Sequence, residues 1–250
     1  MKIAACAFPI IVDLELATQT MFSYIDQAAE AKCDMIVFPE AALGGLDISG
    51  VISIDSLMGL KIDALSISCI KERAAQNGIA IGLGFLELSE DQIWDSYLIF
   101  DQRGETALHY RRYTDGWLPR VGAPDYYGCG KVSGVTQSGF GKLGVLLCGD
   151  LFHEDLVQFM ADQSVDLCLH PMARAFPYSI NTQRHWDSEE FPIYLEQYAK
   201  LKTNVIVCNS VDIERQDLTP YCGGAWFVSK GRVISSLPLM QEGLLIYDGF

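Results

Sequence analysis

Runs of apolar residues alternate along this chain with segments in which apolar positions recur at helical spacing. The run over residues 2–9 predicts a strand, and Met21 and Ile25 lie on the apolar face of a helix predicted over residues 14–33. A short apolar run over residues 34–40 predicts the next strand. A strand, a helix and a strand in this order are typical of a parallel pair inside a layered α/β sheet.

The rest of the chain continues this alternation, with hairpins placed between the helices. Helical spacing predicts three further helices, over residues 62–78, 153–163 and 188–203. Apolar runs on either side of polar turns predict three hairpins, over residues 94–112, 131–148 and 222–238. Single strands are expected over residues 79–88, 165–171, 204–210 and 242–248, and irregular structure over residues 112–131 and 171–188.

The alternation runs through the whole chain without a linker or a low-complexity segment, so we expect residues 1–250 to form a single α/β domain. Half of the residues are hydrophobic and 20% are charged, which is enough apolar material for a full core. A four-layer, sandwich-like α/β domain fits this pattern better than two separate domains.

The charge balance argues against two classes of partner. The formal net charge is −14 at pH 7, and a chain this acidic repels phosphate backbones, so we expect no nucleic-acid partner. The longest apolar runs are far shorter than the roughly 18 residues that a membrane span needs, so we expect no membrane partner. The apolar N-terminal run is too short for a signal peptide.

The eight cysteines are scattered, and no two are spaced as CxxC. This distribution predicts reduced thiols in a cytoplasmic protein, with neither a disulfide framework nor a metal site. The sequence also lacks a GxGxxG fingerprint and a P-loop, so we expect no cofactor.

Three reactive side chains stand at or just after the C-terminal end of a predicted strand, where functional residues gather in α/β folds. They are Glu40, Arg112 and Cys148. Each one alone could be structural, as a solvated acid, a surface cation or a small core residue. Their shared placement favours one common site.

The segments around these residues resemble the nitrilase, or carbon–nitrogen hydrolase, superfamily. The matching pieces follow the order of that family along almost the whole chain: "MIVFPEAALGG", "YLIFDQRGETALHYRRY", "GKLGVLLCGDLFHED", "VDLCLHPMA", "YAKLKTNVIVCNSVD" and "CGGAWFVSKGRVI". The resemblance implies an αββα sandwich that pairs with a second copy into an αββα–αββα homodimer. It also implies a Glu-Lys-Cys catalytic set that cleaves nonpeptide C–N bonds in a small-molecule substrate.

Within this resemblance, Cys148 is the expected nucleophile, which attacks an amide-like carbon and forms a thioester. Glu40 is the expected general base, for the thiol and later for the hydrolytic water. The oxyanion needs donors, and we expect them from the backbone N–H of Gly149 and from a nearby cation.

The cation is where the sequence departs from the family. The position of the family's lysine falls on Arg112, and an arginine is effectively never deprotonated. Many family members also carry a second glutamate some residues later; here that count falls on Arg120, and the only acids between Arg112 and Cys148 are Asp115 and Asp125. Three interpretations stay open: an amidase-like hydrolase with an altered oxyanion cation, a catalytically impaired homologue that binds a ligand, and an acyltransferase with an amine acceptor.

Three more residues are candidates for the walls of the site. His170 and Met172 end a predicted strand at a corner that lines the pocket in the family, although His170 could equally be a packed core histidine. Glu154 begins the helix after Cys148 and could buttress the site. An acid at this position also complements the helix dipole without any catalytic role.

Overall fold

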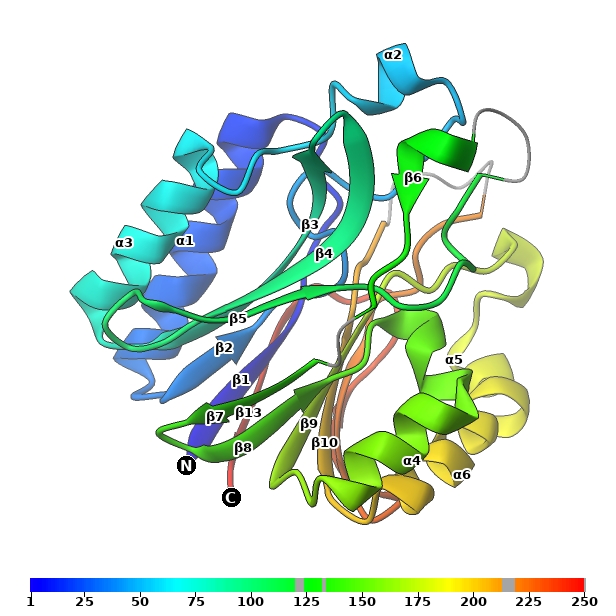
Figure 1. The fold of residues 1–250 in the computed structure, drawn as a ribbon. Coiled ribbons are helices and arrows are strands. Elements are labelled where there is room, and N and C mark those ends of the chain that lie inside the picture. Colours follow the sequence, from blue (N-terminus) through cyan, green and yellow to red (C-terminus); the bar gives the residue numbers. More distant parts are fainter. Residues whose placement is uncertain (120–123, 132–133, 213–218, 250) are drawn as a thin grey trace.

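The computed structural model describes residues 1–119, 124–131, 134–212 and 219–249. Two mixed β-sheets pack face to face, and helices cover the outer face of each sheet (Figure 1). The predicted αββα sandwich is therefore confirmed for the single chain. Arg120 lies outside the described residues.

The first sheet has the strand order β13-β1-β2-β3-β4-β5, with the short strand β6 paired to β4. Parallel pairs β1–β2 and β2–β3 form its centre, and antiparallel pairs form its two sides. Its strands are β1 (Lys2–Ala7), β2 (Met35–Val37), β3 (Ala80–Ser89), β4 (Gln92–Phe100), β5 (Thr106–Arg111), β6 (Tyr127–Gly128) and β13 (Gly243–Asp248).

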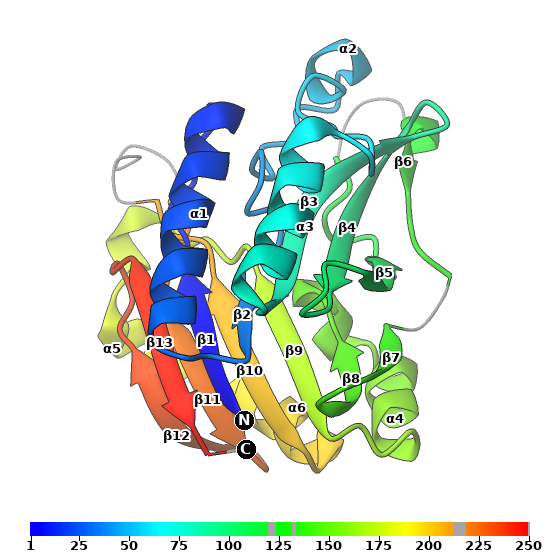
Figure 2. The ribbon, with the colours of Figure 1, turned by 90° about the vertical axis from the view of Figure 1, so that its left-hand side faces the viewer.

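The second sheet has the order β12-β11-β10-β9-β8-β7, again with parallel pairs in the middle, β8–β9 and β9–β10 (Figure 2). Its strands are β7 (Val135–Ser138), β8 (Gly141–Val145), β9 (Leu167–Met172), β10 (Asn204–Asn209), β11 (Ala225–Ser229) and β12 (Arg232–Leu237).

The longer helices lie where the apolar periodicity predicts them. Helices α1 (Leu14–Glu30) and α3 (Leu65–Asn77) cover the first sheet, and α4 (Glu154–Asp162) and α6 (Phe191–Leu201) cover the second. Asp13 caps α1, where its Oδ1 accepts from the N–H of Leu16 at 2.9 Å. Helix α3 ends at Gly78 in the left-handed conformation, as its Asn-Gly ending predicts.

Several local features differ from the sequence-based expectation. The strand expected to run to Cys148 ends at Val145, and a 3₁₀ helix, η2 (Cys148–Phe152), follows. The segment 171–188 contains turns of helix, η3 (Tyr178–Ile180) and α5 (Gln183–His185), and a π-helix, η4 (Trp186–Glu190), leads into α6. The loop regions also hold α2 (Ile52–Asp55) and η1 (Pro124–Tyr126), which are too short to give a periodic signal.

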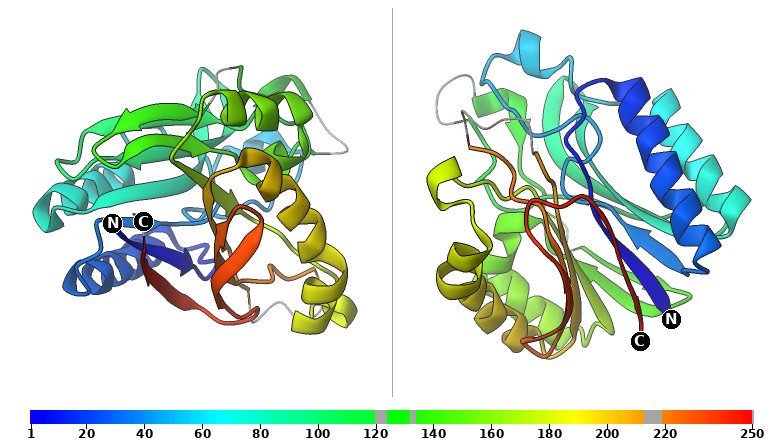
Figure 3. Two further views of the ribbon diagram at one scale, coloured as in Figure 1. Left: turned by 90° about the horizontal axis from the view of Figure 1, so that it is seen from below. Right: turned by 180° about the vertical axis from the view of Figure 1, so that it is seen from behind.

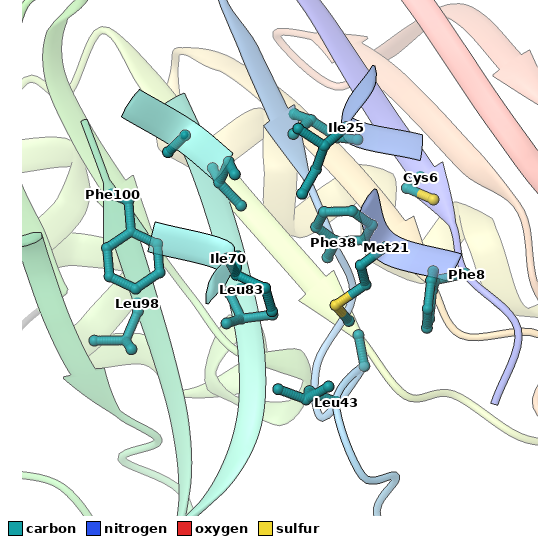
Figure 4. Packing of buried hydrophobic residues seen from close by; sticks show 14 of the residues in the cluster. Cys6, Phe8, Met21, Ile25, Phe38, Leu43, Ile70, Leu83, Leu98 and Phe100 are labelled. Carbon is teal, nitrogen blue, oxygen red and sulfur yellow. The ribbon is translucent and has the colours of Figure 1, made fainter. Parts of the chain in front are cut away.

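Three large apolar layers make up most of the core, and a smaller cluster lies around Leu86, Ile93, Trp117 and Tyr127. Between α1, α3 and the first sheet, Met21 and Ile25 pack with strand residues such as Leu83, and the rings of Phe8 and Phe38 meet edge to face at 5.5 Å (Figure 4). A second layer lies under α4 and α6. The third layer fills the space between the two sheets. Burial of all three layers is the main favourable contribution to folding.

The layer between the sheets also fixes the two ends of the chain. Strands β1 and β13 run antiparallel, with Lys2 opposite Asp248, so the N- and C-terminal ends lie side by side (Figure 3). Tyr97 of β4 is buried in this layer and donates its hydroxyl to the carbonyl of Phe38 at 2.8 Å. That bond ties the turn after β2 to the middle of the sheet.

No helix within the described ranges is long and apolar enough to cross a membrane.

Candidate active site

Glu40 lies in a tight turn directly after β2. The turn packs against β3 at Gly84, where a Cβ atom would stand 2.8 Å from the Cα of Glu40. Only glycine permits this close approach of two backbones. The next residue, Ala41, has a φ of 45°, a strained value for a residue with a side chain. The turn directs the fully buried carboxylate of Glu40 toward the end of β5.

Arg112 follows the last residue of β5 and is 4% exposed. Its Nη1 donates to Glu40 Oε1 at 2.7 Å and more weakly to Asp95 Oδ2 at 3.4 Å, and its Nε donates to Thr114 Oγ1 at 3.1 Å. Burial opposes the charge of Arg112, but Glu40, Cys148 and Asp95 outweigh burial and raise its pKa. Arg112 therefore stays cationic.

Cys148 opens the 3₁₀ turn after β8 and keeps part of its surface exposed. Its φ is 42°, so its backbone is in the left-handed region that non-glycine residues seldom adopt. Burial and the negative charge of Glu40 raise the pKa of its thiol to about 12, although Arg112 and the backbone N–H of Ala173 oppose the rise. The resting thiol is therefore protonated at neutral pH, and its reaction needs a base.

His170 of β9 holds the backbone of Cys148 in this conformation. His170 is completely buried; its Nε2 lies 2.9 Å from the carbonyl oxygen of Cys148, and its Nδ1 lies 2.7 Å from the hydroxyl of Tyr198 on α6. Burial lowers the pKa of His170 to about 4, so the ring is neutral. Because a carbonyl only accepts, Nε2 carries the hydrogen and Nδ1 accepts from Tyr198.

Asp150 links the turn of Cys148 to the segment that follows Arg112. Its buried carboxylate accepts from the hydroxyl of Tyr110 at 2.6 Å and from backbone N–H groups at 2.8 Å (Thr114), 3.3 Å (Leu147) and 3.4 Å (Tyr113). Burial still raises the pKa of Asp150, against these hydrogen bonds. The carboxylate thus joins the ends of β5 and β8, which belong to different sheets.

Gly149 lies against the guanidinium of Arg112. A Cβ atom at Gly149 would stand 2.6 Å from Arg112 Nη2. Within the described part of the chain, Nη2 donates no hydrogen bond, whereas Nη1 and Nε are both engaged. One arm of the cation is thus uncommitted and faces the residue beside the thiol. This is the arrangement that stabilises a developing oxyanion.

The sequence-predicted residues are distributed unevenly around this centre. Glu40 and Arg112 are in direct contact, and Cys148 interacts electrostatically with both. Gly149 belongs to the turn of Cys148 and lies against Arg112, and His170 contacts the same turn at the carbonyl of Cys148.

Two predicted wall residues lie further out. Met172 is buried in the apolar layer under α6, which Cys148 borders. Glu154 is exposed at the start of α4 and lines a surface hollow with Gln197 and Lys200. Among the described residues, Glu154 makes no hydrogen bond or ion pair with the side chains around Cys148.

Sequence reasoning missed three contributors, Asp95, Thr114 and Asp150. Asp95 carried a detectable signal, because strand alternation puts it on the same face as the buried Tyr97. Asp150 stands in the motif that contains Cys148, but its role depends on donors from another sheet. No group of metal-ligating side chains occurs among the residues that the structure describes.

Comparison with known proteins gives a consistent picture. A profile of the carbon-nitrogen hydrolase family matches residues 2–248. The chain is 26% identical to an arylacetonitrilase of Hypocrea virens over 151 residues, and 28% identical to a cyanide hydratase of Alternaria brassicicola over 161 residues. These matches cover 57% and 58% of this chain but 45% and 43% of the two relatives, so the chain spans less than half of their length.

Solved structures extend the likeness to nearly the whole chain. A carbon-nitrogen hydrolase from Helicobacter pylori G27 superimposes with a TM-score of 0.85 at 15% identity, covering 98% of this chain and 87% of that one. A mutant of a Nesterenkonia AN1 amidase from the nitrilase superfamily gives 0.78 at 18% identity, covering 98% and 89%. At these identities the likeness establishes the shared fold.

Proposed function

The chain belongs to the carbon–nitrogen hydrolase family, and we propose that it hydrolyses the nonpeptide C–N bond of a small amide or related compound through a thioester on Cys148. The observation that carries the proposal is the uncommitted Nη2 of Arg112, which faces Gly149 beside the thiol. An oxyanion formed on the substrate would find a cationic donor already in place there.

In the first half of this mechanism, Cys148 Sγ attacks the substrate carbonyl carbon while Glu40 accepts the thiol proton. A thiol whose pKa is raised to about 12 needs such a base. Arg112 Nη2 and the N–H of Gly149 stabilise the negative oxygen. The C–N bond then breaks, the nitrogen takes the proton from Glu40, and the acyl group stays on sulfur.

In the second half, Glu40 takes a proton from a water molecule, which attacks the thioester carbon. The same donors stabilise the second oxyanion. Collapse of this intermediate breaks the C–S bond, and the thiolate recovers its proton from Glu40 as the acid leaves. In this proposal Arg112 fills the role that the resemblance assigns to a lysine, as a fixed positive charge that exchanges no proton.

A second candidate function has an observation of its own. The 2.7 Å ion pair between Arg112 and Glu40 already engages the proposed base. If this ion pair keeps Glu40 from acting as a base, the chain would bind a ligand without turning it over. The two candidates differ in whether an acyl group ever appears on Cys148.

The test is to incubate the protein with a panel of short amides and nitriles and to detect acyl-Cys148 by mass spectrometry and the released ammonia by a colorimetric assay. We expect an adduct confined to Cys148, and ammonia release that Cys148→Ala abolishes. Cys208→Ala, at a buried thiol in another strand, is the matched control. Hydroxylamine would trap the thioester as a hydroxamate, and product analysis with and without an added amine separates acyl transfer from hydrolysis. Ligand binding with neither adduct nor ammonia would favour the second candidate, and turnover in Cys148→Ala would exclude the covalent mechanism.

We also propose that the protein works in the cytoplasm as a homodimer. All eight cysteines are free thiols in the structure, in keeping with a reducing compartment.

A further inference from the structure

The buried centre holds more acids than cations. Glu40, Asp95 and Asp150 are each at most 1% exposed, and Arg112 is the one cation in hydrogen-bond contact with any of them among the described residues. Three ionised carboxylates around one guanidinium would leave two uncompensated negative charges in a dry site. Such charges are costly, and a buried acid avoids the cost by keeping its proton.

The hydrogen bonds indicate which acid that is. Asp150 accepts hydrogen bonds from a tyrosine hydroxyl and from backbone N–H groups, and these bonds stabilise its ionised form. Glu40 takes the short bond from Arg112 at 2.7 Å. Asp95 Oδ2 accepts only a weak hydrogen bond, at 3.4 Å, from the same Nη1 atom of Arg112. It is therefore the carboxyl group with the weakest support for a charge.

The unsatisfied oxygens point the same way. Asp95 Oδ1 and Glu40 Oε2 are both buried and make no hydrogen bond to any described residue as long as both groups are ionised. The two side chains are close enough to share a hydrogen bond when one of them carries a proton. A proton on Asp95 would make that carboxyl group a donor to Glu40, in a site where each group has one oxygen without a partner. Two buried acids that share a proton are an established way to hold one of them neutral.

A neighbouring acid on the next strand shows the opposite case. Glu87 is as well buried, but Ser96, His109 and Arg111 all bond its carboxylate, at 2.6–2.9 Å. Although burial opposes its charge, these partners lower the pKa of Glu87 to about 2. Burial alone therefore does not decide the charge of an acid: for Glu87 the donors outweigh it, and for Asp150 they only oppose it.

The surroundings of Asp95 agree with the geometry. Burial and the charge of Glu40 raise its pKa well above the ordinary value, and the opposing effect of Arg112 is smaller. The titratable groups that face it are Glu40 after β2, Arg112 and Tyr110 at the end of β5, Cys148 and Asp150 in η2, and Cys129 after β6.

We infer that Asp95 is a neutral carboxylic acid that donates its proton to the carboxylate of Glu40 and acts as a positioning residue for the base of the proposed reaction. The inference rests on the proposed function only for its catalytic meaning, since the charge state of Asp95 belongs to the resting protein. Hydrogen bonds from both Arg112 and Asp95 would fix the orientation of the Glu40 carboxylate.

The test compares Asp95→Asn with Asp55→Asn in thermal unfolding from pH 4 to pH 8. Both aspartates are buried, but Asp55 is ionised, with bonds from Ser49, Gly50 and Tyr127 at 2.6–2.9 Å and a lowered pKa despite its burial. An acid whose pKa is raised by folding destabilises the native state increasingly as pH rises above the unfolded value of about 3.9. An acid whose pKa is lowered does the reverse.

We therefore expect the melting temperature of Asp95→Asn, relative to the wild type, to rise with pH, by about 3–5 °C for each unit by which the pKa is raised. The same difference for Asp55→Asn should fall as pH rises. Infrared spectra of the wild type at pH 7 should contain the C=O band of a protonated carboxylic acid, and Asp95→Asn should lack it. A falling difference for Asp95→Asn, or a wild-type spectrum without that band, would overturn the inference.

Steady-state kinetics of two Asp95 variants test whether Asp95 positions Glu40. An asparagine amide can still donate to Glu40, whereas a leucine cannot, so Asp95→Asn should keep kcat at least about tenfold above Asp95→Leu, with a smaller difference in KM. Equal losses in both variants would remove the positioning role. If the wild type itself releases no ammonia, the proposed function fails, while the unfolding and infrared results still decide the charge of Asp95.

Discussion

Arg112 divides its donors between two tasks. Nη1 binds the carboxylates of Glu40 and Asp95, and Nη2 faces the turn that contains Cys148. Arg112→Ala should lower kcat by about 10²–10³-fold, the scale for loss of one oxyanion donor. Arg112→Lys keeps the charge with a single ammonium and should keep measurable activity. The measurement is kcat/KM on short amides for the three proteins.

Two outcomes would contradict this account. Unchanged turnover in Arg112→Ala would show that Arg112 has no catalytic part. An inert wild type that Arg112→Lys activates would show that the cation must exchange a proton, which arginine cannot do.

Gly149 has no room for a side chain. In Gly149→Ala the new methyl group would stand 2.6 Å from Nη2, and the guanidinium cannot retreat because Nη1 and Nε are bonded. We expect kcat to fall at least about tenfold, since a misplaced donor stabilises the oxyanion less. Gly139→Ala is the matched control, because a Cβ there meets nothing within 4 Å. Equal activity of the two variants would show that Nη2 is not a donor in the reaction.

The individual side chains of the site differ in how far the sequence could predict them. Glu40, Arg112 and Cys148 each follow a strand within a recognisable motif, so local patterns were enough to predict that they lie together; their catalytic roles stay predictions. Asp95 and Asp150 act through partners from other strands, and those pairings depend on sheet order and register. A strand pattern shows that a side chain is buried, but it does not show which charge the side chain meets.

The pairing of β9 with α6 supports the turn of Cys148 from behind. Tyr198 on α6 fixes the ring of His170, and His170 fixes the carbonyl of Cys148. Tyr198→Phe should lower the free energy of unfolding by about 0.5–1.5 kcal/mol, the net value of one hydrogen bond. It should also reduce kcat, because the strained φ of Cys148 loses support.

Chemical denaturation and steady-state kinetics measure both effects. The control is Tyr24→Phe on α1, in the apolar layer of the first sheet. A kcat for Tyr198→Phe equal to that of the control would limit His170 to a packing role.

Helices and strands with a strong apolar period were predictable, and short elements were not. The patterns located α1, α3, α4 and α6 because each buries one regular face. The π-helix over Trp186–Glu190 has no period of its own; Trp186 stacks on Phe191 and Trp226, at centroid distances of 5.0 Å each, and these tertiary contacts set its shape. Such contacts exist only after the second sheet has formed.

Self-association remains a prediction from the family resemblance. Phe152 and Ile193, beside the layer of α4 and α6, are 44% and 49% exposed, so both side chains are accessible to a second copy. We expect light scattering at micromolar concentration to give a dimer, and Ile193→Asp to weaken it. The control is Leu57→Asp, at an 83% exposed side chain after α2. A wild-type monomer would contradict the dimer.

The proposed catalytic groups are divided between the two sheets. Glu40, Asp95 and Arg112 are carried by the first, and Cys148, Gly149 and His170 by the second. Apolar side chains such as Leu147 and Leu169 set the spacing between them. The rate of the proposed reaction should therefore depend on the distance between the two sheets. A cavity at Leu169, or hydrostatic pressure, which acts on internal voids, would misalign cation and thiol while every strand ladder stays intact. The proposed activity should therefore be lost under conditions in which the protein is still folded.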